Sequence, residues 1–344
     1  MENRTYSEEQ KIHYMLQLRE LKEKLPRFLG AYFTGTEQRI SARTQLSYAT
    51  DLNTFFEYVK DNNPTYKNTD MHDMEISVLT CITAQDIEEY LSYIKYYRKD
   101  GRDYVNNERA IKRKLAAIRS MYGYFHKGRI IDENPSLQVD TPKLHKKQII
   151  RLDDDEANAM LNAADTGCNL TEKQQKYHER SHVRDTALLM LLLGTGMRVS
   201  ELVGINLDDV DWANDRIKIM RKGGNESFVY FGDEVRYALL DYMEERDTLD
   251  SPDNALFLSY QYRRLSVRSV EKLVRKYSLG VTSKHITPHK LRSTYGTNLY
   301  KATGDIYLVA DALGHADVNT TRKHYAEIEE DRRASVKNAV KIKK

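Results

Sequence analysis

The sequence predicts a mostly α-helical fold, in which an all-helical N-terminal domain precedes a mixed α/β C-terminal domain with one small antiparallel sheet. Three observations support this. Apolar residues recur at spacings of three and four along several long stretches, which is typical of amphipathic helices. Two short stretches on either side of residue 223 instead alternate between apolar and polar residues. At 344 residues the chain is also too long for one ordinary core, which favours two domains.

Helices account for the N-terminal domain. A charge-rich helical arm is expected within residues 1–30. The first long amphipathic helix should start after Ser41, because serine caps helix N-termini well. A second helix is expected from Thr83 to Lys99, and a third, with a basic outer face, should end at Gly128, since glycine often follows the last helical residue.

The domain boundary is expected where the helical spacing of apolar residues stops. Residues 1–135 form the predicted N-terminal domain, residues 136–148 a basic linker with a Lys/His cluster, and residues 149–344 the C-terminal domain. A basic linker suits a chain that wraps around DNA, although a solvated linker is the ordinary alternative.

Charge is unevenly distributed. The formal net charge is only +3. From Lys95 to Arg129, however, there are eleven Lys and Arg residues against three acids, Asp100, Asp103 and Glu108. Such a local excess is a typical footprint for phosphate binding, and a solvated helix face is the alternative.

The C-terminal domain is expected to combine a buried helix, a hairpin and further helices. Residues 183–194 are nearly all apolar, and Gly194 and Gly196 should break this helix. Residues 215–231 predict a β-hairpin with a glycine-rich tip. A later helix should be capped by Thr287 and end at Gly304. Its core face is predicted to hold Leu291, Tyr295, Leu299 and Ala302.

Two places could hold an anion. His289 and Arg292 share one face at the start of the Thr287 helix, and a helix N-terminus favours negative charge. The pair predicts a phosphate or carboxylate site, with a simple surface pair as the alternative. Arg198 follows a glycine break beside a buried helix, and Glu201 could either orient it by a salt bridge or cap the next helix. No nucleotide-binding glycine motif is present.

Tyr325 is one of 24 tyrosines, but it comes ten residues after His315 in "LGHADVNTTRKHY". A phenol has a pKa of about 10 and attacks nothing unaided. It needs cations to stabilise the phenolate and a group to accept its proton. Two arginines and two histidines would meet that need at a phosphodiester. Lys222, at the hairpin tip, could either reach a ligand or remain in solvent.

These residues resemble, in order, the signature of the tyrosine site-specific recombinases, also called the phage integrase family. The N-terminal half, with "RTQLSYATDLNTFFEYV" and "RKLAAIRSMYGYF", is similar to the SAM-like core-binding domain of Xer-type recombinases. Two features depart from the usual pattern. Residues 167–182 make a longer connection than is common in Xer proteins, and ten residues rather than nine separate His315 from Tyr325.

The resemblance implies a reaction. Tyr325 would attack the scissile phosphate, leaving a 3′-phosphotyrosyl link and a free 5′-hydroxyl. Arg198 and Arg292 would hold the phosphate, and Lys222 would protonate the leaving oxygen. No metal and no nucleotide cofactor are implied, because the phosphotyrosine conserves the bond energy for rejoining.

The resemblance also implies supporting residues and partners. His289 and His315 would assist proton transfer and hold the phosphate, and Glu201 would support Arg198. Four protomers, identical or shared with a second recombinase, would join two DNA duplexes at specific core sites and exchange strands through a Holliday junction. The expected DNA-contacting residues are Arg43, Thr44, Tyr48, Arg109, Lys112, Arg113 and Arg119.

The alternative functions are a non-cutting DNA-binding accessory factor of the same fold, which the filled catalytic positions disfavour, and a type IB topoisomerase, which the two-domain Xer-like layout disfavours. Neither a signal peptide nor an apolar stretch of membrane-spanning length is found, and the two cysteines show no metal or disulfide spacing. We therefore expect a cytoplasmic protein with no membrane partner.

Overall fold

The computed structural model describes residues 5–143, 149–221, 224–315, 317–319 and 322. Two compact units divide the chain, Met1–Lys147 and Gln148–Lys344. In the described residues, no helix has both the length and the apolar character to cross a membrane.

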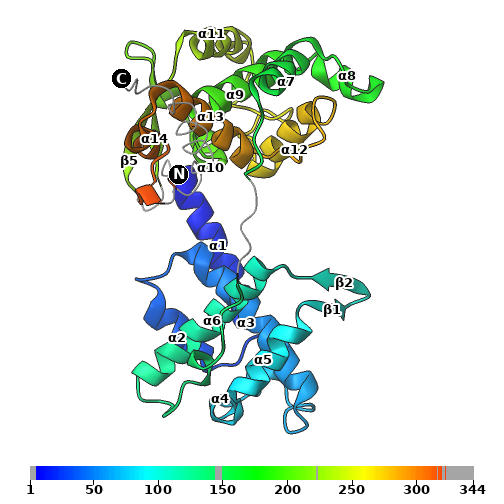
Figure 1. Ribbon diagram of the computed structural model, residues 1–344, viewed down its shortest axis with the longest axis vertical. Helices are drawn as coiled ribbons and strands as arrows, with labels where there is room; N and C mark the ends of the chain where they lie inside the picture. Colours follow the sequence, from blue (N-terminus) through cyan, green and yellow to red (C-terminus); the bar gives the residue numbers. More distant parts are fainter. Residues whose placement is uncertain (1–4, 144–148, 222–223, 316, 320–321, 323–344) are drawn as a thin grey trace, which may run out of the picture. The chain divides into compact units, whose positions relative to one another are not determined.

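Helices dominate the first unit (Figure 1). Its elements are α1 (Tyr6–Lys22), α2 (Leu29–Thr36), α3 (Ala42–Asn62), the 3-10 turn η1 (Met71–Asp73), α4 (Val78–Cys81), α5 (Ala84–Tyr93), β1 (Tyr96–Lys99), β2 (Arg102–Val105), α6 (Glu108–Lys127) and the 3-10 turn η2 (Pro135–Leu137). The predicted cap of α3 is confirmed, because the Ser41 hydroxyl accepts a hydrogen bond from the Thr44 backbone. Thr83 caps α5 in the same way.

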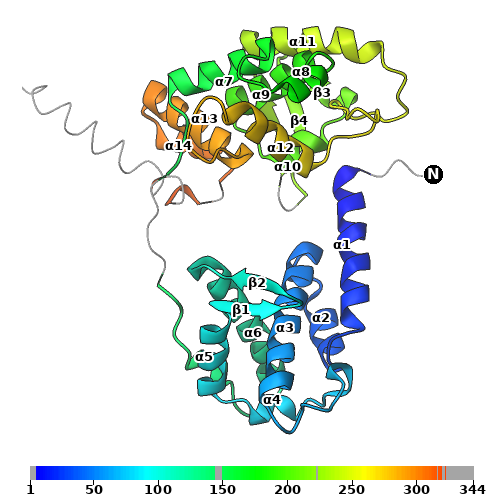
Figure 2. The same cartoon turned by 90° about the vertical axis from the view of Figure 1, so that its right-hand side faces the viewer.

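The helix predicted from Thr83 to Lys99 is too long. It ends at Tyr93, and residues 96–105 pair as an antiparallel hairpin, β1–β2, with Tyr97 opposite Tyr104 (Figure 2). The reason is the Asp100-Gly101 pair, whose φ angles of 51° and 72° make the left-handed turn that joins two twisted strands. This dipeptide is the local signal that the helical reading overlooked.

The core of the first unit lies between α3 and α6, where aromatic rings pack edge to face. Phe55, Phe56 and Phe125 are at most 1% exposed. Asp51 of α3 is also buried, and it accepts hydrogen bonds from Lys114 and Arg113 of α6. Burial raises the pKa of the Asp51 carboxyl, and the two cations oppose that rise. This paired charge holds the two long helices in one register.

The chain after α6 is packed against the first unit. Ser136 and Val139 are buried. The Arg119 guanidinium donates hydrogen bonds to the carbonyls of both residues and to the Thr141 hydroxyl. The beginning of the predicted linker is therefore attached to α6 by side-chain hydrogen bonds, up to residue 141.

The second unit surrounds one apolar helix (Figure 1). Its elements are α7 (Asp154–Thr166), α8 (Glu172–His178), α9 (His182–Thr195), α10 (Val199–Gly204), the 3-10 turn η3 (Leu207–Asp209), β3 (Val210–Asp211), β4 (Arg216–Met220), β5 (Glu226–Tyr230), α11 (Asp233–Asp247), α12 (Val267–Ser278), α13 (Pro288–Thr303) and α14 (Ile306–Ala312). Leu188, Leu189 and Leu192 of α9 are fully buried, and α7, α11 and α13 pack around this helix. The predicted buried helix is confirmed.

The predicted hairpin is the β4–β5 pair, which β3 extends into a three-stranded antiparallel sheet. Two finer expectations are wrong. Gly194 does not break α9, since the helix continues to Thr195 and ends where Gly196 adopts a φ of 61°. Ala302 of α13 is exposed, and Tyr300 is buried in its place, because the helix packs against α14 through a face rotated from the predicted one.

The long connection at residues 167–182 forms helix α8. Its last residue, His178, is buried, and its imidazole Nε2 lies 2.8 Å from the Ala164 carbonyl oxygen of α7. The His178 ring also fills the space beside Gly167, where a Cβ atom would approach Nδ1 to 2.8 Å. The extra residues are therefore packed onto the unit through His178.

A partly buried ion pair joins α7 to the loop before α13. The Glu156 carboxylate accepts hydrogen bonds from Lys284 at 2.5 Å and Thr282 at 2.7 Å. Burial by itself would raise the pKa of this carboxyl, but the hydrogen bonds outweigh it and lower the pKa from 4.5 to about 2. A carboxylate with a lowered pKa stabilises the fold fully above pH 4.5, and that stabilisation is lost as the pH falls through about 2.

We predict that Glu156→Gln lowers the free energy of unfolding by about 1–2 kcal/mol at pH 7. The difference from the wild type should shrink as the pH falls from 4.5 toward 2. Urea unfolding at a series of pH values measures this. Asp155→Asn, which changes the exposed neighbour, is the matched control and should cost much less. A deficit of the same size at every pH would contradict the assigned role of the Glu156 charge.

Candidate active site

Arg198 stands at the start of α10, where the chain leaves the Gly196 turn. Glu201, three residues later, performs both of the functions predicted as alternatives. Its Oε2 accepts a hydrogen bond from the Arg198 backbone at 2.7 Å, and its Oε1 accepts one from Arg198 Nη1 at 2.7 Å. The Glu201 side chain is 3% exposed and the Arg198 side chain 34%. A buried carboxylate therefore orients a guanidinium that still reaches solvent.

Arg292 approaches the same place from α13, which lies beside α14 in both views (Figures 1 and 2). The residue is only 4% exposed. Its guanidinium donates from Nη1 to the Gly196 carbonyl at 2.7 Å and from Nη2 to the Leu313 carbonyl. Burying a cation is costly unless its donors find acceptors, and these carbonyls supply them.

A third arginine, Arg221, was not predicted. It follows β4 directly, and its side chain is 14% exposed. Its Nη1 donates to the Leu313 carbonyl at 3.2 Å and its Nη2 to the Ala312 carbonyl at 3.3 Å. Its place beside Lys222, at the end of the hairpin, was the signal in the sequence that could have identified it.

The three arginines meet at one turn, which comprises Ala312, Leu313 and Gly314. Arg198 completes the set by donating from Nη2 to the Gly314 carbonyl at 3.1 Å. Gly314 has a φ of 57°, and a Cβ atom there would lie 2.4 Å from Arg221 Nη1. Any larger residue would be strained and would displace the guanidinium. The turn leads directly into His315.

Of the other four predicted catalytic residues, two lie within the described part of the chain. His289 is exposed on the first turn of α13, three residues before Arg292. His315 is partly buried at the end of the three-arginine turn, and its backbone N–H donates to the Ala310 carbonyl at 2.9 Å. Lys222 and Tyr325 lie outside the described residues.

This arrangement is suited to an anion with several oxygens. Among the described residues, the Glu201 carboxylate contacts Arg198 and Arg221, so the cluster of Arg198, Arg221 and Arg292 holds more positive than negative charge in that part of the chain. Planar guanidinium groups donate paired hydrogen bonds that match phosphate oxygens. Arg198 is the most exposed of the three and is therefore the one best placed to contact a ligand.

The predicted DNA-contacting residues lie on α3 and α6 of the first unit. Arg43, Arg109, Lys112 and Arg113 are exposed, and Thr44, Tyr48 and Arg119 are partly buried. Three of these arginines contact other parts of the protein, and the Arg43 guanidinium lies over the Tyr14 ring, 6.0 Å from its centroid. Arg113 donates to Asp51 and Ser47 of α3, and Arg119 holds the chain after α6. Lys112 and Arg109 are thus better candidates for phosphate contacts than Arg119.

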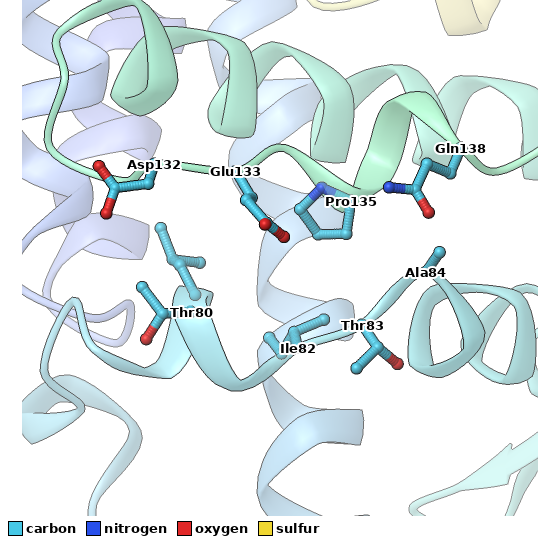
Figure 3. Close-up of a pocket in the computed structure, with 9 residues that line it drawn as sticks. Thr80, Ile82, Thr83, Ala84, Asp132, Glu133, Pro135 and Gln138 are labelled. Atoms are coloured by element: carbon cyan, nitrogen blue, oxygen red, sulfur yellow. The ribbon is translucent and has the colours of Figure 1, made fainter.

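A pocket of about 400 Å³ lies elsewhere in the first unit, between α4–α5 and the chain around η2 (Figure 3). Its charged lining residues are both acidic, Asp132 and Glu133. The carboxylates would repel a phosphate, so this pocket does not extend the predicted anion site.

Comparisons with known proteins agree with the fold. The model described as "Phage integrase family" matches residues 150–332. Tyrosine recombinase XerC of Caldanaerobacter subterraneus subsp. tengcongensis is 33% identical over 310 residues, covering 87% of this chain and 81% of that protein. Tyrosine recombinase XerD of Oceanobacillus iheyensis is 31% identical over 297 residues, covering 85% and 90%.

Solved structures share the fold at lower identity. XerH site-specific recombinase bound to a palindromic difH substrate superposes with a TM-score of 0.65 at 18% identity, covering 95% of this chain and 96% of that one. The Tn1549 transposon integrase in complex with circular intermediate DNA gives a TM-score of 0.60 at 19% identity, covering 88% and 98%.

The chain therefore belongs to the phage integrase family. Within that family it is an Xer-like tyrosine recombinase, as the sequence resemblance predicted.

Proposed function

We propose that this recombinase binds specific core sites in double-stranded DNA and exchanges strands through a covalent intermediate on Tyr325. The observation that carries the proposal is the convergence of Arg198 and Arg292 on the turn that precedes His315. Residues separated by 116 positions in the chain meet there, and they supply fixed positive charge where a phosphate would react.

The proposed cleavage replaces one phosphodiester by another. The Tyr325 phenolic oxygen attacks phosphorus, and the bond from phosphorus to the 5′-oxygen breaks. The DNA 3′ end stays attached to the tyrosine, and the 5′-oxygen leaves as a hydroxyl. Attack by a 5′-hydroxyl in the reverse direction rejoins a strand. The number of phosphate ester bonds is unchanged, so the exchange needs no external energy source.

Each side chain has a distinct role in this proposal. Arg198 and Arg292 would neutralise the non-bridging oxygens as charge develops on the pentavalent transition state. Glu201 would hold Arg198 in the orientation that the structure has. Lys222 would donate the proton to the leaving 5′-oxygen, and His289 and His315 would help hold the phosphate and transfer the proton of Tyr325.

The solved relatives support a DNA partner, since XerH and the Tn1549 integrase were both captured on DNA. We propose a tetramer on two synapsed duplexes, formed by four copies or shared with a second recombinase. We further propose that the protein acts in the cytoplasm.

Covalent trapping tests the function. The protein is mixed with duplexes that carry a nick beside the scissile phosphate, so that the short leaving fragment diffuses away and rejoining fails. Candidate recombination sites of the host supply the sequences, and denaturing gels detect protein joined to DNA. A covalent band at one site and not at scrambled sequence supports the proposal. Retarded DNA on native gels without any covalent band would favour a non-cutting binder.

DNA binding by the first unit should depend on exposed cations of α6. We predict that Lys112→Ala weakens binding similarly at all sequences and reduces the slope of log affinity against log salt by about 1. Binding isotherms at four salt concentrations measure this. Lys67→Ala, which removes an exposed lysine from the loop after α3, is the control and should leave the slope unchanged. An unchanged slope for Lys112→Ala would remove this residue from the DNA contact surface.

A further inference from the structure

Arg221 connects two parts of the second unit that are about ninety residues apart in sequence. Its backbone closes the hairpin, since its N–H donates to the Asn225 carbonyl at 2.8 Å and its carbonyl accepts from Gly224 at 3.1 Å. Its side chain donates to the carbonyls of Leu313 and Ala312. One residue thus belongs to the hairpin by its main chain and contacts the turn before His315 by its guanidinium.

These hydrogen bonds are made to carbonyls at the C-terminal end of α14. The last carbonyls of a helix have no partner within the helix, and α14 ends at Ala312. A cation at a helix C-terminus satisfies such carbonyls and is favoured by the helix dipole. The missing Cβ of Gly314 leaves the space that the Arg221 guanidinium occupies. The turn at Gly314 therefore has room for the Arg221 guanidinium only because residue 314 has no side chain.

We propose that Arg221 is a positioning residue for DNA cleavage: it fixes the turn Ala312–Gly314, and through it the place of His315, relative to Arg198. This inference rests on the proposed function. Arg221 also lies 3.8 Å from Glu201 Oε1, the atom that accepts from Arg198 Nη1, so one carboxylate connects the two guanidinium groups.

The contacts of Arg221 are those of a residue that fixes the turn, whereas Arg198 is the arginine that reaches solvent. The Arg221 side chain is 14% exposed against 34% for Arg198. Both of its terminal nitrogens already donate to carbonyls of the turn. Removing it should therefore alter the geometry of the site more than the affinity for DNA.

A double-mutant cycle tests the inference. Single-turnover rates of covalent complex formation are measured for the wild type, Arg221→Gln, His315→Ala and the double variant, together with DNA affinity and thermal unfolding. We expect Arg221→Gln to slow cleavage about 10- to 100-fold, with DNA affinity changed less than about threefold. His315→Ala should then cost far less in the Arg221→Gln background than in the wild type, because the histidine is already misplaced.

The hairpin supplies a matched control. Arg216→Gln removes an arginine of β4 that pairs with Asp211 and lies over the Phe228 ring, away from the turn. Arg216→Gln should lower the cleavage rate only slightly. When it is combined with His315→Ala, the fold-decrease in rate should be the product of the two single fold-decreases. Arg221→Lys, which keeps the charge but not the paired donors, should restore part of the rate.

Several outcomes would overturn the inference. Cleavage by Arg221→Gln within twofold of the wild type would do so, and so would effects of Arg221→Gln and His315→Ala that simply multiply. If Arg221→Gln lost its unfolding transition, Arg221→Lys would replace it in the same cycle with the same criteria. A wild type that forms no covalent complex at any site would instead remove the proposed function, and this inference with it.

Discussion

Tyr325→Phe is expected to abolish the covalent protein–DNA complex while leaving DNA binding intact. The substitution removes only the hydroxyl oxygen that would bond to phosphorus, so the loss should be complete within detection. Nicked suicide duplexes and denaturing gels measure the covalent product, and native gels measure binding by the same preparation. In the proposed site, Arg198 and Arg292 hold the phosphate and the phenol does not, so affinity should change less than about twofold.

Tyr307→Phe is the matched control. Tyr307 lies in α14 of the same unit, is 70% exposed, and precedes the Gly314 turn. This variant should form the covalent complex at the wild-type rate. A covalent band that survives Tyr325→Phe would assign the nucleophile to another residue and contradict the proposed chemistry.

Arg198→Ala is expected to slow cleavage by about 100- to 1,000-fold, the range found when one preorganised donor to a developing oxyanion is removed. Arg198 is the partly exposed member of the cluster, so the variant should keep its fold. Arg198→Lys should recover little, because an ammonium group does not reproduce the two parallel hydrogen bonds of a guanidinium. Single-turnover rates of covalent complex formation provide the measurement.

Arg180→Ala removes an exposed arginine from the connection between α8 and α9 and serves as the control. It should cleave at the wild-type rate. Glu201→Gln should fall between these variants, because the amide still accepts a hydrogen bond from the Arg198 backbone but lacks the charge that orients the guanidinium. Wild-type rates in Arg198→Ala would show that the guanidinium does not contact the reacting phosphate.

Local signals in the sequence predicted local structure well. Ser41 and Thr83 were identified as helix caps because a hydroxyl at that position satisfies a backbone N–H three residues later. Gly304 ends α13 for an equally local reason, its left-handed backbone conformation. The failure at β1–β2 was also local, since residues 96–99 were predicted to be helical and the Asp100-Gly101 turn that follows them was overlooked.

Local sequence signals did not predict the contacts between segments that are far apart in the chain. The exposed face of α6 was assigned to DNA as a whole, yet Arg119 is used to hold residues 136–141 and Arg113 to pair with Asp51. The spacing of the basic side chains along α6 does not distinguish an arginine that contacts DNA from one that contacts the protein. Only the position of the neighbouring chain determines which arginine finds an acceptor in the protein.

The sequence by itself determined the fold class, some of the helix termini, the family, and the order in which Arg198, Glu201, Arg292 and His315 occur. These depend on periodicity, capping and motif spacing, which are properties of short stretches. The tertiary structure decided that three arginines meet at one turn and that Arg221 is among them. The physical reason is that a helix end leaves carbonyls unpaired, and only folding determines which distant guanidinium groups reach them.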